Sequence, residues 1–501
     1  MKVRVRFAPS PTGPLHIGGV RTALYNYLFA RKSGGDFILR IEDTDQNRLV
    51  PGAEQYIIES LKWIGIEPNE GVGFGDGPYA PYRQSDRKDT YRQYAEQLLD
   101  AGYAYYAFDT EDELELLKAT YPNFKYDANT RSHGKNSLTL SADEVAQRLQ
   151  NREHHVIRIK LPADEEVKFH DEIRGWVSVN SSQMDDKVLL KSDGMPTYHL
   201  ANVCDDYVMK ITHVIRGEEW LPSAPLHVML YRYLGWEASM PKFAHLPLLL
   251  KPDGNGKLSK RDGDRLGFPV FPLEWADPKT NEVSSGYKQR GYLPEAVFNM
   301  LAFLGWNPGT EQEIFSKEEL IEAFSMENIH KAGAKFDFEK AKWFNAEYIK
   351  RLSDERLAEL VKDIVVERFG PQDMDYLTKA VGMVKERLVF LNDIEQFGYL
   401  FQATEKYPDA SLAKIINIKS GAFHPGAFET FLKEYTSADP TALEITLKDF
   451  ANSNEIKAGD LMKFLRVSLV GELSGPAIPD LIVLLGVEET GKRVKNCFSQ
   501  L

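Results

Sequence analysis

The first thirty residues alternate between apolar and polar positions in a pattern that predicts a strand, a loop and a helix. Residues 3–7 alternate apolar side chains with arginines, which is the period of a strand with one buried face. Residues 8–14 contain three prolines and a glycine, which end the strand. Apolar residues then recur at helical spacing from Ile17 to Tyr27.

Gly18 and Gly19 lie at the start of this helix, and His16 lies at its entrance. Glycine lets a ligand approach the backbone, and the free N–H groups of a helix N-terminus favour a phosphate. A strand, loop and helix without a ligand is the simpler alternative.

The next apolar run, residues 37–39, predicts a buried strand and is followed by Glu42, Asp43 and Asp45. In an open α/β sheet, ligands bind beyond the carboxyl ends of the strands. These carboxylates are therefore candidates to hold an ammonium group, a sugar hydroxyl or a metal, and a solvated acidic turn is the alternative. Helices are predicted at residues 53–63 and 86–99.

The chain changes character at about residue 103. Aromatic side chains cluster at 103–108, a helix is predicted at 111–120, and strands are predicted at 157–161 and 175–179. These elements indicate an α+β insertion.

Strand-like runs at 203–208 and 211–215 predict that the first sheet resumes after the insertion. From about Ala334 the apolar residues follow helical spacing. Two groups carry this pattern: Leu357, Leu360, Val361 and Ile364, then Val381, Val384, Leu388 and Leu391. The last third of the chain is thus predicted to be all-helical with its own core.

Length and composition narrow the class of protein. A chain of 501 residues predicts two to four domains, and 43% hydrophobic with 27% charged residues is typical of a globular protein. The most apolar run, residues 478–487, is too short to span a bilayer, and the chain opens directly on a strand, so we expect no membrane segment and no secretory signal. Two distant cysteines, Cys204 and Cys497, favour a reducing compartment. The net charge of −13 neither suggests nor excludes nucleic acid.

Two further stretches carry candidate chemistry. Arg216 ends a predicted strand, where it is suited to bidentate binding of a carboxylate or phosphate, and a surface ion pair with Glu218 is the alternative. Residues 257–264 read KLSKRDGD and predict a mobile basic loop, with a solvated run of charges as the alternative. His133, His154, His155 and His170 show no metal-ligand spacing with a cysteine, and we expect no metal site.

Five segments in this order resemble bacterial-type glutamyl-tRNA synthetases: RFAPSPTGPLHIGGVRTAL, LRIEDTD, PTYHLANVCDD, VIRGEEWL and KLSKR. Among them, HIGG and KLSKR resemble the two signatures of class I aminoacyl-tRNA synthetases. The resemblance continues through GYLPEAVFNMLAFLGW, FDFEKAKWFN and DLMKFLRVSL, and so covers nearly the whole chain.

The resemblance implies a Rossmann-type α/β class I catalytic domain with an α+β insertion, followed by an all-α anticodon-binding region. In chain order, the resemblance implies the first catalytic half at 1–102, an inserted acceptor-end-binding domain at 103–195, the second catalytic half at 196–250, the basic signature loop with a stem-contact region at 251–333, and the helical anticodon-binding region at 334–501.

The resemblance also implies ATP-dependent ligation of glutamate to the 3′ end of tRNA(Glu), through glutamyl-adenylate, with release of pyrophosphate and AMP. ATP with Mg²⁺, L-glutamate and tRNA(Glu) are the expected ligands of a cytoplasmic monomer. His16, Lys257 and Lys260 are the implied catalytic residues. The implied ATP contacts are Thr12, Gly13, His16, Gly18, Gly19, Glu219, Trp220, Lys257, Ser259 and Lys260. The implied glutamate contacts are Arg6, Ala8, Ser10, Glu42, Tyr198, Asn202 and Arg216, and Asp45 is the implied contact to the tRNA acceptor end.

The chain departs from many members of this family in two places. Residues 102–109 carry no cysteine where relatives hold a zinc knuckle, so we expect no structural zinc. Residues 266–288 lengthen the path from the basic loop to the GYLPEA segment, and their role is open. The alternatives are a glutaminyl-tRNA synthetase, a tRNA-modifying paralogue, a small-molecule nucleotidyltransferase of the same fold and a catalytically silent RNA-binding protein.

Overall fold

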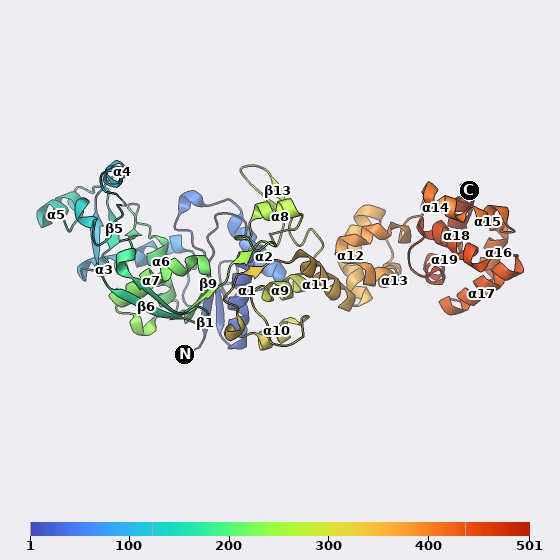
Figure 1. Cartoon of the computed structure of the whole chain (residues 1–501), viewed down its shortest axis with the longest axis horizontal. Coiled ribbons are helices and arrows are strands. Elements are labelled where there is room, and N and C mark those ends of the chain that lie inside the picture. The colour runs from blue at the N-terminus through green and yellow to red at the C-terminus, as the bar shows by residue number, and fades with distance from the viewer. Residues whose placement is uncertain (1, 123, 436) are drawn as a thin grey trace. The chain divides into compact units, whose positions relative to one another are not determined.

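Figure 1 shows the fold in a computed structural model of the chain, which describes residues 2–122, 124–435 and 437–501, with the backbone alone at 260, 261, 264, 419 and 420. The chain divides into two compact units. The first holds Met1–Gln289 with Pro294–Ala341, and the second holds Arg290–Leu293 with Lys342–Leu501.

The first unit begins with the predicted strand, loop and helix. β1 (Arg4–Phe7) leads into α1 (Ile17–Lys32) and then into β2 (Asp36–Leu39), which pairs in parallel with β1 and with β3 (Glu70–Gly71). These predictions are confirmed. Since β1 and β2 are parallel, the end of β1 and the start of α1 lie at the same edge of the sheet, where ligands bind in folds of this kind.

The two helices predicted next are confirmed as α2 (Ala53–Ile64) and α3 (Lys88–Asp100), with a 3₁₀ turn at Gln84–Arg87 before the second. Gly65 ends α2 in the left-handed conformation, with a φ of 80°, so that its N–H reaches the carbonyl of Leu61.

A second sheet runs in the order β7 (Gly175–Asn180), β6 (Glu166–Asp171), β10 (Lys242–Leu246) and β9 (His213–Gly217). β9 and β10 are parallel, and β6 and β7 form an antiparallel hairpin. β1 lies against the start of β9, because the N–H of Thr212 donates to the carbonyl of Arg4 at 2.9 Å. The ends of β1 and β9 therefore face the same region.

The segment expected to be an insertion carries a small antiparallel sheet of β4 (Ala104–Ala107), β5 (Val156–Ile159) and β8 (Val188–Leu190). Its helices are α4 (Glu111–Thr120), as predicted, and α5 (Ala142–Gln150). The predicted strand at 175–179 is β7 of the second sheet.

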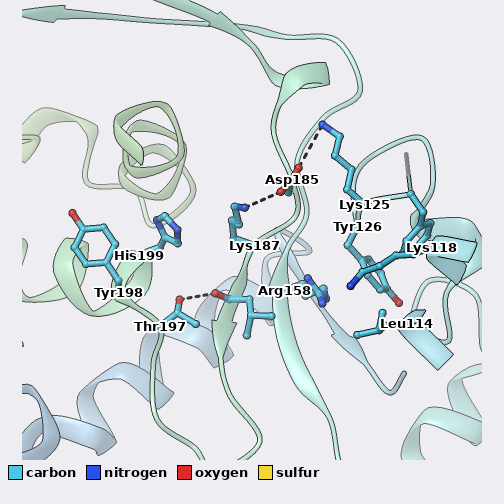
Figure 2. Close-up of a pocket in the computed structure, with 12 residues that line it drawn as sticks. Leu114, Lys118, Lys125, Tyr126, Arg158, Asp185, Lys187, Thr197, Tyr198 and His199 are labelled. Carbon is cyan, nitrogen blue, oxygen red and sulfur yellow. Dashed lines mark hydrogen bonds and ion pairs between the residues drawn. The ribbon is translucent and has the colours of Figure 1, made fainter. Parts of the chain in front are cut away.

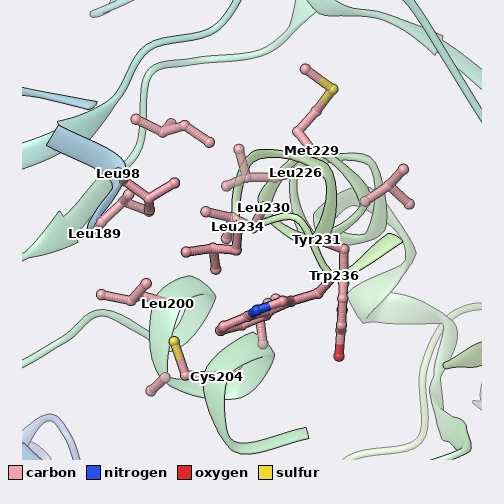
Figure 3. Close-up of a cluster of buried hydrophobic side chains, with 14 of the residues drawn as sticks. Leu98, Leu189, Leu200, Cys204, Leu226, Met229, Leu230, Tyr231, Leu234 and Trp236 are labelled. Atoms are coloured by element: carbon pink, nitrogen blue, oxygen red, sulfur yellow. The ribbon is translucent and has the colours of Figure 1, made fainter. Parts of the chain in front are cut away.

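The predicted strand at 203–208 is wrong, because these residues form the end of α6 (Tyr198–Val208). α6 is buried on several sides. Its apolar residues recur at helical spacing from Leu200 to Val208, but the part from Val203 onward is a short run, which does not distinguish a buried strand from a buried helix. Figure 3 shows the reason for this burial: Leu200 and Cys204 of α6 pack with Leu230 and Trp236 in one hydrophobic cluster. The helix brings Tyr198 and Asn202 to the same edge as β1.

The prediction of a loop throughout 257–264 is also wrong, because α8 (Lys260–Leu266) begins inside it. Ser259 and Asp262 form a reciprocal capping box at the start of this helix. The S-x-x-D pattern at residues 259–262 is visible in the sequence and predicts the start of a helix there.

The remaining elements of the first unit are helices and short strands: α7 (Ala224–Tyr233), β11 (Leu249–Leu250), β12 (Trp275–Ala276), β13 (Val283–Ser284), α9 (Pro294–Ala302), α10 (Lys317–Ala323) and β14 (Ala334–Lys335). β12 and β13 form a hairpin within the 266–288 stretch, and Trp275 packs its ring edge against Tyr56 of α2, with ring centroids 5.2 Å apart. This packing holds residues 266–288 against the first unit.

The second unit is helical, as predicted. α11 (Phe338–Arg351) crosses the boundary between the units and is followed by α12 (Asp354–Phe369), α13 (Met374–Val384), α14 (Asp409–Ile415), α15 (Asn417–Ser420), α16 (Pro425–Glu434), α17 (Pro440–Ser453), α18 (Ala458–Val470) and α19 (Ile478–Ser499). The first apolar repeat lies in α12. The second does not form one helix, because α13 ends at Val384 and Leu388 is extended. Among the described residues, no helix is long and apolar enough to cross a membrane.

Candidate active site

A cavity of about 230 Å³, the first cavity, lies where β1 and β9 end. Its walls come from the loop after β1, the start of α1, the first turns of α6 and the segment after β9. All seven residues that the resemblance assigns to glutamate line it: Arg6, Ala8, Ser10, Glu42, Tyr198, Asn202 and Arg216. Side chains separated by up to 210 positions in the sequence thus converge on one small space.

Arg216 is 5% exposed and is held by three hydrogen bonds. Its Nε donates to Nε2 of His245 at 3.0 Å, Nη1 donates to the hydroxyl of Tyr198 at 2.5 Å, and Nη2 donates to the carbonyl of Trp220 at 3.2 Å. A guanidinium has five N–H donors, so about two remain for the cavity.

The alternative of a surface ion pair between Arg216 and Glu218 is wrong. Glu218 instead pairs with Arg174 and accepts a hydrogen bond from the N–H of Leu248 at 2.9 Å. Arg216 therefore keeps its charge toward the first cavity.

Arg6, the second guanidinium of the first cavity, is bound by a buried carboxylate. Its Nε lies 3.0 Å and its Nη2 3.2 Å from the two oxygens of Asp206, which also accepts from Arg40 at 2.8 Å. Burial alone would raise the pKa of Asp206, but Arg6 and Arg40 outweigh it and hold that pKa below its usual range. The negative charge of Asp206 offsets one of the two guanidinium charges and fixes the plane of Arg6.

Glu42 supplies the carboxylate of the first cavity. Its Oε1 accepts hydrogen bonds from Nδ2 of Asn202 at 2.9 Å and from Nη2 of Arg40 at 3.3 Å. Burial raises the pKa of Glu42, against the opposing effect of Arg40, Arg6 and Asn202. A cationic group bound beside it would favour the ionised form.

A second cavity of about 210 Å³ shares five lining residues with the first: Gly18, Gly19, Thr22, Gly217 and Glu219. It is also lined by His16, Lys257 and Ser259. The two cavities therefore meet at the N-terminus of α1, where free backbone N–H groups favour an anion.

His16 caps α1 with its ring. Nδ1 accepts a hydrogen bond from the N–H of Gly18 at 3.0 Å, and Nε2 is buried with no hydrogen-bond partner within the described part of the chain. Burial, and then the charge of Lys257, lowers the pKa of His16 to about 4, so the ring is neutral at pH 7. Because Nδ1 accepts, the proton is on Nε2, which leaves a buried donor at the second cavity.

Lys257 reaches over the second cavity and pairs with Oε1 of Glu219 at 2.9 Å. Burial opposes ionisation of Glu219, but Lys257 lowers its pKa overall. The side chain of Lys260 lies outside the described residues, so its predicted site is not located.

Four other residues expected at the site do not line the second cavity. Trp220 lines the first cavity, with its ring 4.7 Å from that of Tyr198, and does not line the second. Thr12 and Gly13 lie in the loop before α1 and line neither cavity. Asp45 is exposed and lines neither.

A third and larger cavity, about 480 Å³, opens beside the first and is lined by basic side chains that sequence reasoning missed (Figure 2). These are Lys118, Lys125, Arg158 and Lys187, and Tyr198 and His199 form its other side. Lys125 and Lys187 both point toward Asp185, at 3.4 and 2.7 Å. The basic residues are scattered over seventy positions without a period, so no sequence signal marks this basic cavity.

Within the described residues, no group of three or more His, Cys, Asp or Glu side chains is arranged to hold a metal ion. Cys204 and Cys497 are free and buried. The absence of structural zinc stays a prediction, which elemental analysis of chelator-washed protein would test.

Two protein families match the chain: "tRNA synthetases class I (E and Q), catalytic domain" over residues 2–343 and "Anticodon binding domain" over residues 356–498. A protein of Porphyromonas gingivalis named glutamate–tRNA ligase is 55% identical over 502 residues, which cover 100% of this chain and 99% of that protein. One of Cytophaga hutchinsonii with the same name is 55% identical over 99% of this chain and 96% of its own length.

The fold is similar to a crystal structure of a glutamate tRNA ligase from Elizabethkingia meningosepticum in complex with its amino acid. The two share a TM-score of 0.95 and 49% identity over 100% of both chains. The likeness therefore extends over both units of the chain.

Proposed function

Because the chain belongs to the class I tRNA synthetase family of the E and Q type, we propose that it is a glutamate–tRNA ligase. It joins L-glutamate to the 3′ end of tRNA(Glu) with ATP, through glutamyl-adenylate. The observation that carries the proposal is the first cavity, which presents two guanidinium groups and one carboxylate to a ligand that has two carboxylates and one ammonium group.

In the first step, an oxygen of the glutamate α-carboxylate attacks the α-phosphorus of ATP, and the bond to pyrophosphate breaks. Negative charge builds on the leaving phosphates. The Nε2–H of His16 and the N-terminus of α1 donate to phosphate oxygens, and Lys257 neutralises charge as pyrophosphate leaves. The resemblance assigns the same role to Lys260. Mg²⁺ enters with ATP. The step needs no covalent intermediate on the protein, since positioning and charge stabilisation supply the catalysis.

Glutamate is oriented by charge in this proposal. Arg216 and Tyr198 hold the side-chain carboxylate, Arg6 provides a second cation, and Glu42 with Asn202 faces the ammonium group. Glutamine would bring an NH₂ group against guanidinium donors, and a site of this kind can reject such an analogue by about 10⁴–10⁵ because its polar groups stay unpaired.

In the second step, a hydroxyl of the terminal ribose of tRNA attacks the adenylate carbonyl, and AMP leaves. We assign the acceptor end to the inserted segment 103–195 and Asp45, and the anticodon to the helical region, in line with its match to an anticodon-binding family. A monomer acting in the cytoplasm, where translation takes place, completes the proposal.

Charging of purified tRNA(Glu) with labelled glutamate tests the activity directly. We expect glutamyl-tRNA with glutamate, and none with glutamine. ATP–pyrophosphate exchange is measured beside it, with and without tRNA, and we expect exchange only when tRNA is present. Equal exchange without tRNA, together with no charging, would favour a small-molecule nucleotidyltransferase. No exchange under either condition would favour an RNA-binding protein without activity.

A further inference from the structure

The guanidinium of Arg216 rests on a buried histidine and a buried aspartate that line none of the cavities described above. Nε of Arg216 donates to Nε2 of His245 at 3.0 Å, and Nδ1 of His245 lies 2.6 Å from Oδ2 of Asp171. Asp171 and His245 are both 0% exposed. The three side chains come from β6, β9 and β10, and so cross three neighbouring strands of one sheet.

The hydrogen-bond partners of His245 determine which of its two ring nitrogens carries the proton. The Nε–H of arginine can only donate, so Nε2 of His245 has to present its lone pair. The remaining proton is then on Nδ1, which donates to the carboxylate of Asp171. His245 is therefore neutral, and its acceptor faces Arg216.

Asp171 is itself fixed by backbone. Its Oδ1 accepts hydrogen bonds from the N–H groups of Ile173 at 3.0 Å, Arg174 at 2.8 Å and His245 at 3.3 Å. The turn between β6 and β7 and the adjoining strand β10 thus hold the carboxylate, which in turn holds the imidazole ring in one orientation. A rotated ring would lose both of its side-chain hydrogen bonds.

We propose that Asp171 and His245 are positioning residues for glutamate recognition, which set the rotation of Arg216 so that its free N–H donors face the substrate side-chain carboxylate. This inference rests on the proposed function. Asp171 belongs to the segment assigned to the insertion, so a residue of that segment orients the arginine of the catalytic domain.

The groups around His245 determine the pH at which its ring becomes protonated and can no longer accept a hydrogen bond from Arg216. Asp171 faces it from β6, Arg174 from the following turn, Arg216 from β9 and His227 from α7. Burial, and then Arg216 and Arg174, lower the pKa of His245 against the opposing effect of Asp171. Protonation would place an N–H of His245 against the N–H of Arg216, so protonation of His245 should weaken glutamate binding.

Steady-state kinetics of the full chain with tRNA(Glu) test the proposal through His245→Leu and His245→Gln. A lost hydrogen bond to a charged group should raise KM for glutamate about 10- to 100-fold in His245→Leu and narrow the preference for glutamate over glutamine, with KM for ATP changed less than about twofold. The amide oxygen in His245→Gln can accept from Arg216 and should restore most of the affinity for glutamate. His213→Gln, on β9 but away from Arg216, is the matched control and should match wild type.

Nitrogen chemical shifts of the imidazole in wild-type protein provide a test that does not depend on a variant that folds. We expect the His245 ring to carry its proton on Nδ1 at neutral pH. A proton on Nε2, or a folded His245→Leu protein with wild-type KM for glutamate, would overturn the inference. Wild-type protein that activates no glutamate would instead overturn the proposed function.

Discussion

Asp206 binds Arg6 through both carboxylate oxygens, at 3.0 and 3.2 Å, with the two side chains 2% and 3% exposed. Removing one partner of a buried ion pair costs more than the pair contributes, because the other charge is left uncompensated. Asp206 also accepts from Arg40, which is fully buried, so loss of the Asp206 charge would leave Arg6 without its carboxylate and Arg40 with Glu42 and Asp205 alone.

We predict that Asp206→Asn lowers the free energy of unfolding by about 3–5 kcal/mol, measured by urea denaturation followed by circular dichroism. Glu115→Gln is the matched control, because its ion pair with Lys118 is exposed and should contribute less than about 1 kcal/mol. Equal stability of the two variants would show that Arg6 and Arg40 do not depend on Asp206.

Lys257 pairs with Glu219 across the second cavity and does not line the first. Lys257→Ala should slow ATP–pyrophosphate exchange by about 10²–10³-fold, the effect of removing one electrostatic donor, while KM for glutamate changes little. Lys242→Ala, an exposed lysine at the start of β10, is the control. If exchange keeps its wild-type rate in Lys257→Ala, the lysine is a solvated charge.

The sequence predicted the parts of the site that depend on local pattern. Alternation placed β1, and the glycines after His16 marked the start of α1. The helical spacing of α6 is complete only from Leu200, so the shorter run that begins at Val203 predicts a strand in part of the helix that carries Tyr198 and Asn202.

The hydrogen-bond and ion-pair partners of the charged residues cannot be predicted from the local sequence pattern. Glu218 lies two residues from Arg216 but pairs with Arg174, and His245 lies 74 residues from Asp171. Such pairs are set by how strands adjoin in the sheet, which spacing along the chain does not encode. The resemblance predicted the residues that line the site, but not the side chains that fix them by hydrogen bonds, such as His245 beside Arg216 and Asp206 beside Arg6.

Two half-buried histidines, His16 and His199, make the free energy of unfolding depend on pH. Burial and then Lys257 lower the pKa of His16 to about 4, and burial followed by Lys187 and Arg216 lowers that of His199 to about 4, from an ordinary 6.5. Between these values the unfolded chain binds protons that the native chain does not. Their contribution to stability is therefore complete above pH 6.5 and is lost as the pH falls toward 4.

We predict that the free energy of unfolding decreases as the pH is lowered from 6.5 toward 4. Over this range, the free energy of unfolding of His199→Gln should decrease by about 1–3 kcal/mol less than that of the wild-type protein. Urea midpoints measured at several pH values check this. Parallel curves for wild type and variant would mean that His199 titrates normally in the folded protein.

Arg216 is buried, is held by three hydrogen bonds and has one side open toward the first cavity. Its replacement should therefore weaken the use of glutamate and leave ATP binding unchanged. Arg216→Gln removes the cation that faces the substrate side-chain carboxylate. We predict that the rate of charging with glutamate falls by at least about 10²-fold. The ratio of glutamate activation to glutamine activation should also become smaller, because the NH₂ group of substrate glutamine would no longer face the N–H donors of Arg216. KM for ATP should stay close to wild type, since Arg216 does not line the second cavity. Arg232→Gln on α7, which breaks the ion pair of Arg232 with Glu165, is the control for the loss of an arginine. Both substrates are compared in the same exchange assay with tRNA present. A variant of Arg216 that keeps wild-type charging and discrimination would remove it from the glutamate site.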